Sequence, residues 1–179
     1  MFIIAISFNR REYQIVLYKN LVYVDKVTSS NASKNLMLCI DSILERNSLT
    51  LDDVSKVGFL SGPGSFTSAR ILCATCLGLK LTYDKVLFVP VLINEAIHSV
   101  ENCAIVMQCN MLMWHLFIDN QWKLVNIDDL LQMEFEKWTS VDDIDLKGNK
   151  IEWPNLSYCI AKYCDAITEQ KDLMPFYGY

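Results

Sequence analysis

The sequence predicts an α/β fold in which mixed β-sheets are flanked by helices. In the first third of the chain, three strand-like segments are followed by a helix, a strand and a second helix. A second group of strand-like segments begins near residue 98. We therefore expect a first lobe over residues 1–97 and a reduced second lobe over residues 98–179.

Apolar runs and polar–apolar alternation predict the strands of the first lobe, and the short link at 19–20 predicts a hairpin. The expected strands cover 2–7, 12–18, 21–27, 56–61 and 86–91. Apolar residues at helical spacing predict an amphipathic helix over 33–47.

The next expected helix, 66–80, is apolar or small at almost every position between Arg70 and Lys80. A helix on one face of a sheet normally keeps a polar outer stripe. A helix that is apolar all round needs cover on both sides, from the sheet and from either the rest of the chain or a partner.

The second lobe is expected to begin with a strand meander and to end with a helix. The expected strands are 103–109, 111–118 and 121–125, and the expected helices are 127–138 and 158–168. Gly148 and Asn149 predict a turn between these two helices. No internal repeat of fixed period is visible.

Composition and charge exclude several classes of protein. The formal net charge is −5, and a chain this acidic offers no general nucleic-acid surface. No segment reaches the roughly 18 consecutive apolar residues of a membrane span. Arg10 and Arg11 follow the apolar start rather than precede it, the reverse of a secretory signal. We expect a cytoplasmic protein that makes no membrane contact.

The cysteines and histidines do not form a recognisable metal or catalytic site. The seven cysteines are odd in number and irregular in spacing, so we expect reduced thiols packed as small apolar side chains. Cys73 and Cys76 lack the second pair that a zinc site needs. The two histidines are not in a metal-binding pattern, and paired acids sit at expected helix starts. We expect no catalytic residue, no metal and no cofactor.

The loop that precedes the second helix has the sequence "GPGS". Gly62 and Gly64 permit unusual backbone angles, Pro63 stiffens the turn, and Ser65 can cap the helix. The free N–H groups of a helix start could hold a phosphate. The first strand, however, ends in Ser7 with no carboxylate to hold a metal-bound triphosphate, so a structural loop is the favoured interpretation.

The stretch "GPGSFTSARILCATCLGLK" (62–80) resembles the signature of the bacterial TsaB (YeaZ) family, usually GPGSFTG-[LV]-R-I-G. Weaker similarities follow in the right order: the first strand resembles "ILAIDTS", "AIVMQCNMLMWHLFI" stands in place of "ILPAIDARMGEVYWA", and "KGNKI" is similar to a "GNGA" turn. The resemblance covers most of the chain.

The resemblance implies an actin-like, two-lobed fold of the ribonuclease H-like class. It also implies a non-catalytic subunit that pairs with TsaD, the enzyme that transfers threonylcarbamoyl to adenosine in tRNA, and that a TsaE-type ATPase can join. No direct tRNA binding by this chain alone is implied. Pairing would use the first two helices, whose candidate residues are Leu36, Met37, Ile40, Leu44, Phe66, Ala69, Arg70, Cys73 and Cys76.

The chain departs from the family pattern at several positions. Ser7 and Phe8 stand in place of Asp-Thr, Ser68 and Leu72 replace glycines, and "QCN" (108–110) replaces Asp-Ala-Arg. The second lobe is also shorter than in a typical member. The loss of the aspartate weakens any nucleotide role.

Two other functions stay open at this point. One is a small actin-like phosphotransferase, which a carboxylate at the end of the first strand would favour. The other is a homodimer without an enzyme partner, which would use the same apolar helices. If the second helix meets a partner through its cysteine face, Cys73→Glu or Ala69→Glu should abolish binding and leave the fold largely intact.

Overall fold

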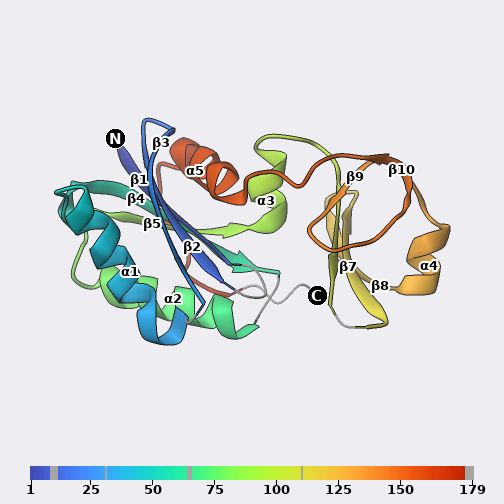
Figure 1. Ribbon diagram of the computed structural model, residues 1–179, viewed down its shortest axis with the longest axis horizontal. Coiled ribbons are helices and arrows are strands. Elements are labelled where there is room, and N and C mark those ends of the chain that lie inside the picture. Colours follow the sequence, from blue (N-terminus) through green and yellow to red (C-terminus); the bar gives the residue numbers. More distant parts are fainter. Residues whose placement is uncertain (9–11, 31, 64–65, 110, 176–179) are drawn as a thin grey trace.

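The computed structural model describes residues 1–8, 12–30, 32–63, 66–109 and 111–175. It contains two five-stranded sheets, with helices on both sides of the first and a short helix beside the second (Figure 1). This arrangement confirms the predicted α/β class and the two lobes of mixed sheets. None of the helices within these ranges is long and apolar enough to cross a membrane.

The first sheet has the strand order β3-β2-β1-β4-β5. Its strands are β1 (Phe2–Phe8), β2 (Tyr13–Lys19), β3 (Val22–Ser29), β4 (Val54–Gly62) and β5 (Leu87–Leu92). The central strand β1 runs antiparallel to β2 and parallel to β4. The side chains of Ile3 to Ile6 are fully buried, because helices cover both faces of the sheet.

Four helices cover the first sheet. They are α1 (Ala32–Arg46), α2 (Phe66–Lys80), α3 (Ile93–His98) and α5 (Leu156–Ala166), and the short 3₁₀ turn η1 (Leu51–Asp53) leads into β4. Figure 1 shows α1 and α2 on one side of the sheet and α3 and α5 on the other.

The second sheet repeats the topology of the first. Its order is β10-β9-β6-β7-β8, with strands β6 (Ala104–Gln108), β7 (Met113–Ile118), β8 (Gln121–Asn126), β9 (Glu134–Ser140) and β10 (Lys147–Lys150). The central β6 is antiparallel to β7 and parallel to β9, as β1 is to β2 and β4. The repeat is one of strand order and direction, which residue spacing does not reveal.

The predicted helix over 127–138 is wrong in its second half. The helix α4 (Ile127–Gln132) ends at Met133, and β9 begins at Glu134. Apolar residues at 130, 131 and 133 fit a helix, but Phe135 and Trp138 point into the core of the second lobe from a strand. Tertiary pairing with β6 therefore overrides the local pattern.

The predicted turn at Gly148 is also wrong, since this glycine lies within β10. Its φ is +117°, and a Cβ atom there would lie 1.8 Å from the carbonyl oxygen of Phe135. Glycine is needed because β10 approaches the backbone of β9 at this point.

The C-terminal helix α5 returns from the second lobe to pack on the first sheet, where it contacts β1, β2, β4 and β5. The Lys56 ammonium group on β4 donates to the carbonyl oxygens of Cys164, Asp165 and Ile167 at the end of α5, at 2.7–2.9 Å. The hydroxyl groups of Tyr18 and Ser157 lie 3.0 Å apart in the core. The boundary at residue 98 stays a prediction, but α5 completes the core of the first lobe.

The two lobes share part of one hydrophobic core. Ile105 and Phe117 of the second sheet belong to the same buried cluster as the first sheet. The indole N–H of Trp122 donates to the side-chain oxygen of Asn94 on α3 at 3.1 Å. A separate, smaller cluster around Trp138 fills the far side of the second sheet.

Six of the seven cysteines are buried free thiols, and Cys109 is exposed. This confirms the prediction that most of them act as small core side chains. Burial raises the pKa of Cys73 to about 11 and that of Cys164 to about 12, and it also raises the pKa of Cys76. These thiols are therefore protonated, and poorly nucleophilic, at neutral pH.

Gly58→Ala should lower the free energy of unfolding by about 1–3 kcal/mol. A Cβ atom at Gly58 would lie 2.2 Å from Cys164 Sγ and 2.7 Å from Ile160 Cγ2, which would push α5 off the sheet. Gly78→Ala is the matched control, because nothing lies within 4 Å of its Cβ position and alanine favours a helix. Urea denaturation of both variants checks this, and equal stability would contradict the close packing.

Alkylation of the native protein at about pH 8 should label Cys109 much faster than the six buried cysteines. Peptide mass mapping after short reaction times measures the order of labelling. The fast phase should vanish in Cys109→Ser. Labelling of Cys73 or Cys76 as fast as that of Cys109 would show that this face of α2 is open to solvent.

Candidate functional site

The predicted partner-binding residues do not lie on one surface. Most of them are buried against the first sheet, namely Leu36, Ile40, Leu44, Ala69, Cys73 and Cys76. Met37 is 41% exposed and Arg70 is also at the surface. Phe66 begins α2, and its side chain lies outside the part of the chain that the structure describes.

Cys73→Glu and Ala69→Glu are expected from the sequence to abolish binding and leave the fold largely intact. The burial of both side chains corrects this expectation. Both side chains are at most 3% exposed, so a glutamate at either position would place a charge in the core. The fold would not stay intact, and a loss of binding would report unfolding. The six buried residues support the helices from beneath.

The surface of α1 and α2 that remains available is defined here as the outer stripe. It consists of exposed residues on or just after these helices: Met37, Leu38, Thr67, Arg70, Ala74, Leu77, Gly78 and Leu81. Thr67, Arg70, Ala74, Leu77 and Leu81 recur three or four residues apart, with Gly78 beside Leu77, so they lie along one side of that helix. The three- and four-residue spacing of these positions could have identified the stripe from the sequence. Because α2 is apolar at almost every position, however, the sequence does not indicate which side of the helix faces the sheet.

The chemistry of the outer stripe suits contact with another protein. Leu38 is 65% exposed, Leu77 47% and Leu81 90%, and the small residues Ala74 and Gly78 leave room for close approach of a partner helix. The exposed acids Asp41 and Glu45 on α1 add charge to the surface around these apolar side chains. An exposed apolar patch among polar residues is typical of an interaction site.

The loop before α2 is described only in part. Gly62 ends β4 with φ at +137°, a region that favours glycine, and Pro63 is buried. Gly64 and Ser65 lie outside the described residues. The structural role expected for this loop stays a prediction.

Ser7 lies near the end of β1 and is 5% exposed. Because β1 and β4 are parallel, Ser7 and Gly62 lie at the same end of the sheet, where both strands have their carboxyl ends. A serine hydroxyl group therefore lies near this end of the sheet, where the TsaB (YeaZ) family pattern has the carboxylate of an aspartate. Among the described residues, no three His, Cys, Asp or Glu side chains are grouped closely enough to hold a metal ion.

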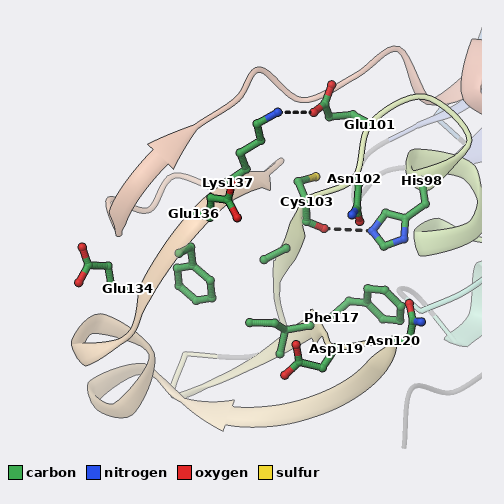
Figure 2. A pocket seen from close by; sticks show the side chains of 13 residues that line it. His98, Glu101, Asn102, Cys103, Phe117, Asp119, Asn120, Glu134, Glu136 and Lys137 are labelled. Carbon is green, nitrogen blue, oxygen red and sulfur yellow. Dashed lines mark hydrogen bonds and ion pairs between the residues drawn. The ribbon is translucent and has the colours of Figure 1, made fainter.

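A pocket of about 580 Å³ lies at one end of the second sheet and contains none of the predicted site residues (Figure 2). The Lys137 ammonium group lies 3.0 Å from a Glu101 carboxylate oxygen, and His98 Nε2 lies 3.0 Å from the Cys103 carbonyl oxygen. The His98 and Phe117 rings meet edge to face, with centroids 5.1 Å apart.

Three further carboxylates line this pocket, from Asp119, Glu134 and Glu136, so its lining is acidic overall. Burial, and next the charge of Glu101, raise the pKa of Cys103 to about 11. The thiol therefore stays protonated at neutral pH and is not an activated nucleophile. The residues that form this pocket come from three separate segments, which no sequence motif connects.

Comparison with known proteins places these features in context. Residues 20–105, which include α1 and α2, match the family of TsaD, tRNA N6-adenosine threonylcarbamoyltransferase. A 67-residue segment is 33% identical to the tRNA threonylcarbamoyladenosine biosynthesis protein TsaB of Buchnera aphidicola. This match covers 37% of the chain and 30% of that relative, so it spans less than a third of the relative's length.

The fold matches solved structures over nearly the whole chain. YeaZ from Pseudomonas aeruginosa superimposes with a TM-score of 0.67 at 12% identity, over 98% of this chain and 99% of that one. A protein with similarity to the peptidase YeaZ from Pseudomonas aeruginosa gives a TM-score of 0.64 at 13% identity, over 99% of both chains. The predicted resemblance to the TsaB (YeaZ) family is thereby confirmed, and the two-lobed fold of this chain is that of the YeaZ structures.

Proposed function

We propose that this chain is a non-catalytic subunit in the formation of threonylcarbamoyladenosine on tRNA, where it binds and stabilises a TsaD-type protein. The name of the Buchnera relative supports the pathway, and the family match of residues 20–105 supports a common origin with TsaD. The outer stripe on α1 and α2 is the observation that carries the proposal, because it offers apolar surface that the described part of the chain leaves exposed.

The outer stripe has enough apolar surface for a specific helix-to-helix contact. Full burial of a leucine side chain contributes about 1.5–3 kcal/mol, and Leu38, Leu77 and Leu81 would all lose exposed surface on binding. The buried residues beneath them, such as Leu72 and Ile43, hold both helices rigidly on the sheet. A preformed surface avoids the entropic cost of ordering on association.

The absence of a catalytic role in this proposal rests on Ser7. A metal-bound phosphate needs carboxylate oxygens to hold the cation, and a serine hydroxyl at the end of β1 is a weak substitute. The threonylcarbamoyl transfer would then belong to the TsaD-type partner. A small phosphotransferase is disfavoured for the same reason.

The proposed further partners follow from charge and from the resemblance. With a net charge of −5, this chain contributes little phosphate affinity, so tRNA would be held by other subunits. A TsaE-type ATPase is the additional partner that the resemblance implies. In isolation, the same outer stripe could join two copies of this chain, because apolar helix faces commonly form twofold contacts.

Leu77→Asp should weaken binding to the TsaD homologue of the same organism by at least about tenfold, because burial of a carboxylate without a partner is costly. Leu131→Asp is the matched control, since Leu131 is a helical leucine of similar exposure, 42% against 47%, on α4 of the other lobe. Co-purification and calorimetric titration measure the effect, and circular dichroism checks that both variants fold.

The two variants give a clear contrast. Loss of the complex in Leu77→Asp with retention in Leu131→Asp supports the outer stripe as the binding surface. Equal binding by both variants would overturn that assignment. If the unaltered chain forms only a homodimer in the presence of the TsaD homologue, the partner itself is wrong.

A further inference from the structure

The outer edge of β5 ends the first sheet, yet the Phe88 N–H, the Phe88 carbonyl oxygen and the Leu92 N–H all have side-chain partners there. Backbone N–H and C=O groups alternate in direction along a strand. In every second residue of β5, both backbone groups therefore point away from β4. The residues concerned are Phe88, Pro90 and Leu92. An open edge of this kind is a template for pairing with another strand.

The side chain of Gln170 takes the place of a neighbouring strand at Phe88. The Phe88 N–H donates to Gln170 Oε1 at 3.2 Å, and Gln170 Nε2 donates to the Phe88 carbonyl oxygen at 2.5 Å. One amide thus satisfies both outward groups of Phe88, as a paired strand would.

At the next two outward residues, the N–H side of the edge is closed by different means. Pro90 has no N–H group to donate. The Leu92 N–H donates to Glu95 Oε2 at 3.0 Å. The other oxygen of Glu95 accepts from the Tyr163 hydroxyl at 2.8 Å and lies 3.2 Å from the Lys171 ammonium group.

Gln170 and Lys171, which are consecutive in the sequence, therefore contribute to covering the two ends of β5. Gln170 covers Phe88 directly, and Lys171 holds the carboxylate that covers Leu92. Leu173, only 5% exposed, anchors the segment in the core of the first lobe. The sequence of β5, "LFVPVL", is wholly apolar, so an uncovered edge would be prone to self-pairing.

We propose that residues 168–175 form a strap that closes the outer edge of β5 against strand pairing with a second copy of this chain. The strap works through side-chain contacts rather than through a further strand. It leaves the outer stripe on the opposite helices, α1 and α2, as the surface for association. This inference does not depend on the identity of the partner.

Gln170→Ala tests the strap without disturbing the core, because Gln170 is an exposed residue. Loss of the two hydrogen bonds should speed amide exchange at Phe88 by about tenfold, measured by residue-resolved NMR. Glu169→Ala, an exposed neighbour in the same segment, is the control and should leave exchange at Phe88 unchanged.

An opened edge should also allow two copies of the chain to associate, and sedimentation velocity over a range of concentrations measures this. All variants carry Leu77→Asp, so that association through the outer stripe does not contribute. The Gln170→Ala protein should associate at concentrations where the Glu169→Ala protein stays monomeric.

Two results would overturn the proposal. Unchanged exchange at Phe88 in Gln170→Ala would show that the glutamine does not protect this edge. Faster exchange without any association at high concentration would show that the edge, once opened, does not pair with a second copy. Failure of this test leaves the proposed TsaD-type partnership intact, since that depends on the outer stripe of α1 and α2 and not on the edge of β5.

Discussion

The packing of α5 on the first sheet is the interaction on which the rest of the structure depends. It brings the end of the chain to the face of the sheet opposite α1 and α2, and the bare backbone at Gly58 allows the close approach. Lys56 fixes the end of the helix through its carbonyl oxygens. Because the sheet is then buried on both faces, the outward side of α1 and α2 remains as apolar surface for a partner.

The return of the chain also connects the two lobes, which share one buried cluster. The polypeptide passes from the first lobe into the second and comes back, and Phe117 of the second sheet belongs to the core of the first. The segment after α5 then closes the edge of β5 through Gln170 and Lys171. One C-terminal stretch thus completes the core, covers a sheet edge and leaves a helical surface open.

Sequence reasoning predicts most of the first lobe, because its strands and helices carry clear periodicities. It fails at 127–138, where Leu130, Leu131 and Met133 imitate a helix that continues into β9. Six of its nine candidate site residues on α1 and α2 face the sheet, and only Met37 and Arg70 belong to the outer stripe, since apolar periodicity identifies burial rather than its cause. Gln170 and Phe88 are 82 positions apart in the sequence, and Lys56 and Cys164 are 108 apart. No local sequence pattern encodes such contacts.

Hydrogen exchange with and without the TsaD homologue tests the account most directly. If the outer stripe is the contact surface, complex formation should slow exchange in residues 67–81 and 37–46 and leave α5 unchanged, because α5 is already covered by the sheet on its inner side and faces away from the partner. Protection confined to α5 or to the second sheet would contradict the account. Such a result would place the partner on a surface other than the outer stripe.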